Sequence, residues 1–327
     1  MIRFFQSAYP SRLLILFILA LILWAPAFIQ AFTSHSSWGI VFYDETIHFL
    51  PGGKFQELLA FILFFTSVFY INKVGSKTGF ISKNSYLTAF FFILLMASFP
   101  QLMQMSPFLF GSLFFIIFLG RLFSLQNTDY PILGAFDAGL LLGLSALFFP
   151  ATLFLFLLIW FALLAYRIGK WRAYAASFLG SILPSLFLFA IYFFLNIKIN
   201  PLTDLMSDLS FHPGLLIVDS TFTLFIVGLL SLGLVISTIQ MAYTQGNKNI
   251  SVRQHALVSM GALLFVFSLL LFFSKYLEAA VMIIGPAALI FTAFFNQLKK
   301  HKWANRFLVI LLILIIFNQY YPLFHVA

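Results

Sequence analysis

Long apolar runs alternate with short polar connections along the whole chain. A run near or above about 20 apolar residues matches the thickness of a bilayer, so each run predicts a membrane-spanning helix. Eleven runs meet this description: residues 13–32, 57–72, 86–100, 107–124, 133–149, 150–166, 173–195, 219–243, 256–274, 279–297 and 306–321. They lack the two-residue alternation of a barrel strand. We therefore expect an all-α membrane protein with about eleven spans (10–12) in a single domain, residues 1–327.

Composition supports this expectation. Hydrophobic residues make up 62% of the chain and charged residues 8%, and the mean hydropathy is +1.05. Soluble domains carry about 25% charged residues, so this chain cannot cover a water-facing surface. It also contains no cysteine, which excludes a disulfide framework, a thiolate metal site and a cysteine nucleophile.

The positive charge of the chain follows the predicted topology. If the runs cross the membrane in turn, 15 of the 18 Lys and Arg residues fall on one side. These are Arg3, Arg12, Lys73, Lys77, Lys83, Arg121, Arg167, Lys170, Arg172, Lys248, Arg253, Lys299, Lys300, Lys302 and Arg306. The other side has Lys54, Lys198 and Lys275. Basic residues accumulate on the cytoplasmic side of membrane proteins, which predicts a cytoplasmic N-terminus. Nucleic acid is not needed to explain the net charge, and we expect no nucleic-acid partner.

The acidic residues collect on the opposite, outer side. On or near that side are Asp44, Glu45, Glu57, Asp204, Asp208, Asp219 and Glu278. Acids contribute little to topology, so their position needs another cause. They either make the outer connections polar or belong to an acidic site for catalysis or cation binding on that side.

Two outer connections are long, residues 33–56 and 196–218. In the first, apolar positions between Ile40 and Leu50 predict a short helix lying in the membrane interface. In the second, the apolar positions of 202–209 recur at spacings of three and four residues and predict another short amphipathic helix.

The first outer connection contains the candidate catalytic residues Asp44 and Glu45. His48 lies three and four residues further on, so on a helix it can approach either carboxylate. A partly desolvated carboxylate at a membrane boundary can act as a general base. The same spacing fits an exposed interfacial helix whose acids only cap or solvate it. Lys54 lies at the end of this connection and Glu57 at the start of the next span, and both are expected to line the same cleft.

Asp44 and His48 are also candidate ligands for a divalent cation, Mg²⁺ or Mn²⁺. Such an ion keeps several waters and needs few carboxylates when it accompanies a phosphate group. The Glu45-x-x-His48 spacing matches the carboxylate metal sites of helical bundles, but no second copy of it is present. His35 and His212 complete a site only if the two outer connections meet.

Asp137 lies inside a predicted span with Gly134, Gly139 and Gly143. An intramembrane acid is a functional candidate by default. However, Asp137 lies near the basic side, within reach of neighbouring Lys and Arg, and glycines permit close helix packing. We expect these four residues to serve packing. Pro150, Pro184 and Pro286 predict kinked or broken helices.

Two features together point to a family. The first is an outer connection with adjacent acids, Asp44-Glu45, before a short interfacial helix. The second is the central stretch from "FLFGSLFFIIFLGRLF" through "FDAGLLLGLSALFFPATLFLFLLIWFALLAYRIGKWRAYAASFLGSILPSLFLFAIYFFL". Together they resemble the GT-C class of integral membrane glycosyltransferases over roughly the first 200 residues. The chain is also similar to Bacteroidota inner-membrane proteins of comparable length and Phe-rich composition.

The resemblance implies a GT-C-like bundle in a bacterial inner membrane. It implies transfer of a sugar from a polyprenyl-phosphate donor to an acceptor on the outer side, with Asp44 or Glu45 as the catalytic acid of the first outer loop. Membrane lipid would be a partner. One alternative is a non-catalytic scaffold subunit of a cell-envelope complex, with envelope proteins as partners. Another is a transporter of lipid or small solutes, which predicts more polar spans than this chain has.

Overall fold

The computed structural model describes residues 2–5, 9–30, 54–81, 85–194, 221–244, 249–273, 277–298 and 301–325. Every regular element in these ranges is a helix. The prediction of an all-α protein is therefore confirmed for the part of the chain that the structure describes.

In the described ranges, eight helices are long and apolar enough to cross a membrane. They are α2 (Pro10–Gln30), α4 (Lys54–Lys77), α6 (Pro107–Ser124, extended by η2, Leu125–Asn127), α9 (Trp171–Phe194), α11 (Thr221–Tyr243), α12 (Ile250–Phe273), α13 (Val281–Gln297, preceded by η5, Leu277–Ala280) and α14 (His301–His325). Three shorter apolar helices are α5 (Leu87–Ala97), α7 (Pro131–Ala146) and α8 (Phe156–Ala165, preceded by η3, Pro150–Leu155). Each predicted run thus holds a helix, and eight of the eleven have the length of a span.

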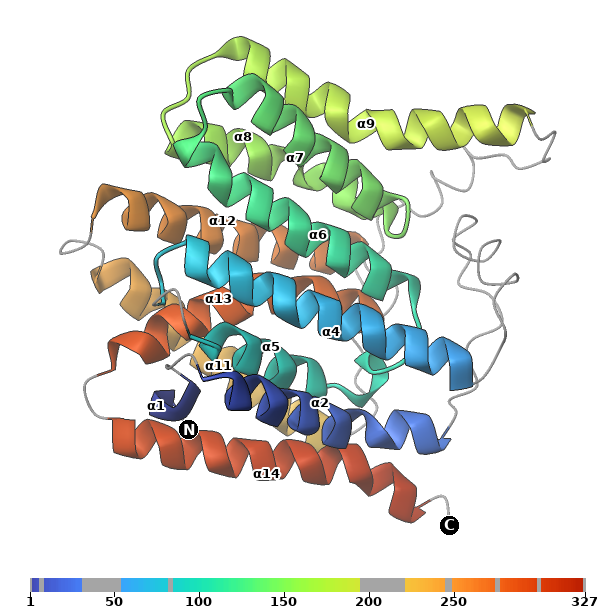
Figure 1. Ribbon diagram of the computed structural model, residues 1–327, viewed down its shortest axis with the longest axis vertical. Coiled ribbons are helices and arrows are strands. Elements are labelled where there is room, and N and C mark those ends of the chain that lie inside the picture. Colours follow the sequence, from blue (N-terminus) through green and yellow to red (C-terminus); the bar gives the residue numbers. More distant parts are fainter. Residues whose placement is uncertain are drawn as a thin grey trace.

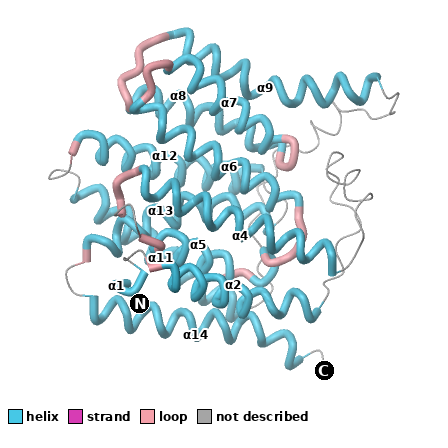
Figure 2. The backbone as a smooth tube through the Cα atoms, viewed as in Figure 1, coloured by secondary structure: helices cyan, strands magenta, loops and turns pink. Residues whose placement is uncertain are grey.

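The helices lie side by side and run back and forth across the molecule (Figures 1 and 2). Their connections therefore gather at two opposite ends. One end, on the left in Figure 1, holds the N-terminus, the C-terminal ends of α4 and α6 and the starts of α9, α12 and α14. By their helix bounds, Lys77, Arg121, Lys170, Arg253 and Lys302 belong to these helix ends or directly precede them, so we call it the basic end. The other end holds the start of α4 with Glu57, the connection 98–106 and η5 with Glu278; we call it the acidic end.

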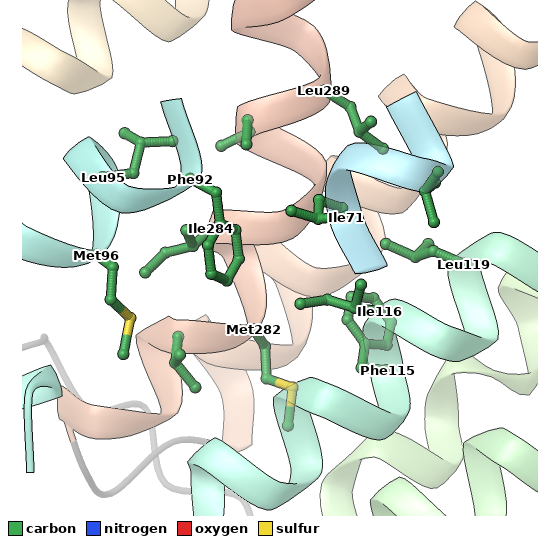
Figure 3. Close-up of a cluster of buried hydrophobic side chains, with 14 of the residues drawn as sticks. Ile71, Phe92, Leu95, Met96, Phe115, Ile116, Leu119, Met282, Ile284 and Leu289 are labelled. Atoms are coloured by element: carbon green, nitrogen blue, oxygen red, sulfur yellow. The ribbon is translucent and has the colours of Figure 1, made fainter. Parts of the chain in front are cut away.

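Helices α5 and α13 form the centre of the bundle. All eleven residues of α5 are buried, and α13 packs against α5, α6, α11 and α12. Figure 3 shows side chains of α4, α5, α6 and α13 meeting there, among them Ile71, Phe92, Ile116 and Ile284. By contrast, α9 and α11 expose many large apolar side chains, as expected for helices that face lipid.

The backbones of α7 and α9 approach each other closely. A Cβ atom on Gly139 would lie 2.2 Å from the carbonyl oxygen of Ser177, and one on Gly143 would lie 2.4 Å from that of Ser181. On the facing helix, a Cβ on Gly180 would lie 2.4 Å from the carbonyl oxygen of Phe136. Only glycine fits at these positions, so the prediction that Gly139 and Gly143 serve helix packing is confirmed.

Of the three prolines predicted to kink or break a helix, one marks a break, and the kinks at the other two stay a prediction. Pro150 begins η3 just after α7 has ended, so the chain does break there. Pro184 lies inside α9 and Pro286 inside α13, and neither helix is interrupted. In a bundle, neighbouring helices and local adjustments can satisfy the backbone group that a proline frees.

Candidate functional site at the acidic end

Five predicted functional residues lie outside the described residues: Asp44, Glu45 and His48 of the first outer connection, with His35 and His212. The same holds for both predicted interfacial helices. The other two candidates, Lys54 and Glu57, lie in the first turn of α4, directly after the first outer connection. The described part of the site is therefore built around the start of this helix.

Glu57 is buried, with only 6% of its surface exposed. The backbone N–H of Met105 donates a hydrogen bond to its carboxylate. Its second oxygen, Oε2, is buried and has no hydrogen-bond partner among the described residues. Met105 lies just before the N-terminus of α6, where the helix dipole favours a negative charge.

The connection that supplies Met105 runs inside the bundle. Ser98, Leu102 and Met103 on it are buried, and after α5 ends at Ala97 it forms only a short 3-10 turn, η1 (Pro100–Leu102). Two side chains of α14 bond the carbonyl oxygens left open at the end of α5. Gln319 Nε2 donates to the Ala97 oxygen at 2.7 Å, and Asn318 Nδ2 donates to the Ser98 oxygen at 3.3 Å. Helix ends leave such carbonyls without partners, so α14 fixes the course of this connection.

Two amide side chains of the same connection extend the polar site. Gln104 Nε2 donates to Glu278 Oε1 at 3.3 Å, which joins the connection to η5. Gln101 Oε1 is buried and has no partner among the described residues. Two side-chain oxygens at this end, Glu57 Oε2 and Gln101 Oε1, are therefore buried acceptors without donors among the described residues.

Lys54 does not neutralise Glu57. Its side chain is exposed, although it lies only three residues before Glu57 on α4. The ion pair found among the described residues joins Arg121 and Asp137, at the basic end. The carboxylate of Glu57 thus has no cationic partner in the part of the chain that the structure describes.

The sequence pattern did not single out Gln101 and Gln104. They lie in "FPQLMQMSP", between two apolar runs, and look like an ordinary polar turn. Only the burial of the connection gives them a role. A usable signal was the shortness of the run before Pro100, since an early stop leaves the following polar residues inside the bundle.

Asp137 has a structural partner. Its carboxylate pairs with the guanidinium of Arg121, so α6 and α7 are joined near the basic end. Both side chains are about two-fifths exposed, at 37% and 39%. This supports the expectation that Asp137 serves packing rather than chemistry.

The basic end also contains a polar network, centred on the first turns of α12. The ring nitrogens of His255 each lie 3.2 Å from a backbone carbonyl oxygen, Nδ1 from that of Thr78 and Nε2 from that of Phe123. Gln254 Nε2 donates to the carbonyl oxygen of Ala165 at 2.9 Å. These contacts tie α12 to the C-terminal ends of α4, α6 and α8.

A wholly apolar groove of about 300 Å³ runs between α7 and α9. It is lined by Leu140, Leu144, Leu147, Leu183, Pro184, Phe187, Leu188 and Ile191. Leu147 and Ile191 place one end of it in the half of the bundle nearer the acidic end.

No group of three or more His, Asp or Glu side chains placed to hold a metal ion occurs in the described ranges. The proposed ligands Asp44 and His48 lie outside them. Comparison of the chain with protein-family models, with curated proteins and with solved structures finds no match.

Proposed function

We propose that the protein is a GT-C-like glycosyltransferase that works at the acidic end of the bundle. The observation that supports this most is Glu57, a carboxylate buried at the start of α4, directly after the segment with Asp44 and Glu45. Intramembrane carboxylates are costly and mark functional sites more often than structural ones. The reaction is transfer of a sugar from a polyprenyl-phosphate donor to an acceptor hydroxyl or amide.

In this proposal Asp44 is the general base that takes the proton of the acceptor. Glu45 or His48 assists it, or holds a divalent ion beside the donor phosphate. Lys54 is exposed at the same end and can contact that phosphate. The apolar groove between α7 and α9 has the chemistry to hold part of the polyprenyl tail.

We further propose that all eleven apolar helices cross a bacterial inner membrane, with the basic end in the cytoplasm and the acidic end outside. The absence of cysteine makes this directly testable. In the otherwise cysteine-free protein, a cysteine at Lys54 should react with a membrane-impermeant maleimide added to intact spheroplasts. A cysteine at Lys170 should react only after the membrane is opened. The reverse pattern would refute the orientation.

The catalytic proposal is tested with Asp44→Asn and Glu45→Gln, singly and together, in a strain that lacks the chromosomal gene. These changes remove the carboxylate charge and keep the size of the side chain. We expect loss of the envelope glycan at normal membrane abundance. Asp204→Asn with Asp208→Asn, in the second outer connection, is the matched control and should keep function. Full function of the Asp44/Glu45 double variant would end the transferase proposal and favour the scaffold.

A further inference from the structure

The polar groups around the connection 98–106 require partners within the protein. Helix α5 has eleven residues and is therefore about 16 Å long, whereas the hydrocarbon core of a bilayer is about 30 Å thick. The connection that follows is partly or fully buried, and its one regular element among the described residues is a single 3-10 turn, η1 (Pro100–Leu102). At membrane depth, such backbone is tolerated only inside protein or beside a water-filled cavity.

Most of these polar groups do have partners. The carbonyl oxygens of Ala97 and Ser98 are bonded by α14, and Gln104 is bonded to Glu278. Among the described side chains of this end, Glu57 Oε2 and Gln101 Oε1 are buried oxygens without a hydrogen-bond partner. When Glu57 is ionised, both atoms only accept hydrogen bonds. What the described residues do not supply to Glu57 Oε2 is a hydrogen-bond donor or a cation.

The surrounding charges leave the Glu57 carboxylate uncompensated. Helices α2, α5, α6 and α13 pack against α4. At the acidic end, the described parts of these helices and their connections contribute one titratable side chain, Glu278, which is itself acidic. On α4 the nearest cation is the exposed Lys54, which makes no ion pair with Glu57. An unpaired buried charge is strongly unfavourable, so the site favours the uptake of one positive charge.

We propose that Glu57 binds a single small monovalent cation, either a proton or an alkali ion, at its unpaired oxygen Oε2. A sugar hydroxyl does not reach this oxygen without displacing the side chains that bury it. A divalent ion would require more carboxylate ligands than Glu57, the one uncompensated carboxylate that the described residues provide at this site. The inference concerns a site within the bundle and does not depend on glycosyl transfer.

The test is thermal unfolding of the full chain in detergent. One arm replaces choline chloride by NaCl or KCl at constant ionic strength and pH 8. The other arm lowers the pH from 8 to 6 in choline chloride. We expect the unfolding midpoint of the wild type to rise saturably, by about 3 °C or more, in one of the arms. A response to salt identifies an alkali ion, and a response to acid identifies a proton.

Glu57→Gln should remove this response. The change keeps the size of the side chain and removes its negative charge. The matched control is Glu278→Gln at the same end, whose carboxylate already accepts a hydrogen bond from Gln104 and which should respond like the wild type. Identical midpoints of wild type and Glu57→Gln in both arms would overturn the proposal.

A second measurement needs no variant. Dicyclohexylcarbodiimide modifies protonated carboxyl groups in apolar surroundings, and mass spectrometry locates the modified residue. At pH 6 in choline chloride we expect modification of Glu57, with protection by NaCl or KCl if an alkali ion occupies the site. Absence of modification would contradict the proposal. Neither measurement reports sugar transfer, so failure here and failure of the transferase proposal can be told apart.

Discussion

The two ends of the bundle differ in how their buried polar groups are partnered. At the basic end, His255 and Gln254 of α12 contact the carbonyl oxygens that end α4, α6 and α8. At the acidic end, Glu57 and Gln101 have buried acceptors without donors among the described residues. At the basic end, the hydroxyls of Thr88 and Tyr166 also have no partner in the described part of the chain, but both are neutral. One end is therefore organised for stability, and the other retains an uncompensated charge at a cost to stability.

This contrast explains why function is assigned to one end. A side chain that satisfies a helix terminus contributes to the folded state and needs no ligand. A buried charged group without a partner destabilises the folded state, and proteins retain such groups where activity needs them. Substitutions at the basic end should therefore change mainly stability, and substitutions at the acidic end should change mainly function.

The largest loss of stability is expected for a substitution midway between the two ends, where α7 contacts α9. Gly139→Val places a side chain against the backbone of α9, where a Cβ alone would lie 2.2 Å from the Ser177 oxygen. We expect a loss of about 3 kcal/mol or failure to fold. Folded yield and function should fall together, as read from membrane abundance and unfolding in detergent. The control is Gly228→Val on α11, where a Cβ meets nothing within 4 Å and the effect should be small. Equal effects would contradict the close approach of α7 and α9.

At the basic end, His255→Leu should destabilise by about 1–2 kcal/mol. The change leaves the carbonyl oxygens of Thr78 and Phe123 without their contacts to the ring. Denaturant unfolding of the purified protein measures the loss, and the exposed neighbour Arg253→Gln serves as the control. Function per folded molecule should remain. An unchanged unfolding midpoint would show that the network contributes nothing.

At the acidic end, Glu57→Leu should stabilise the folded protein rather than destabilise it. Replacing an uncompensated buried carboxylate by an apolar side chain should raise the free energy of unfolding by about 1 kcal/mol in salt-free buffer at pH 8. The lost hydrogen bond from Met105 offsets part of the gain. Function should nevertheless be lost. A destabilisation as large as that of His255→Leu would remove the contrast between the ends.

The smallest effect is expected for the ion pair of Arg121 and Asp137. Both side chains are partly exposed, so either Arg121→Gln or Asp137→Asn should cost about 0.5 kcal/mol. A double-mutant cycle measures their coupling. A coupling of several kcal/mol would mean that the pair is shielded from water and belongs to the core.

Much of the fold could be predicted because hydropathy reports which segments avoid water. The run 107–124 coincides with α6, and the boundaries of the runs at 133–149 and 173–195 differ from those of α7 and α9 by one to three residues. The polar ends of helices were harder to predict. The predicted span 256–274 begins after His255, whereas α12 already begins at Ile250, because its first turns satisfy polar residues through other helices.

The site could be predicted only in part. Glu57 was expected to line a cleft, from its place after Asp44 and Glu45. Its burial against Met105 depends on the early end of α5, which hydropathy does not report. Gln101 gains its role from the same feature. Such contacts join residues far apart in the chain, and a periodic pattern carries no information about them.

The most direct test of the account compares two isosteric changes, one at each end. Glu57→Gln and Asp137→Asn each neutralise one carboxylate, and each is introduced into a strain lacking the chromosomal gene. Growth and envelope glycan are measured at matched membrane abundance. The account predicts that Glu57→Gln abolishes function and that Asp137→Asn retains it. Full function of Glu57→Gln, or loss of function in Asp137→Asn alone, would contradict the assignment of function to the acidic end.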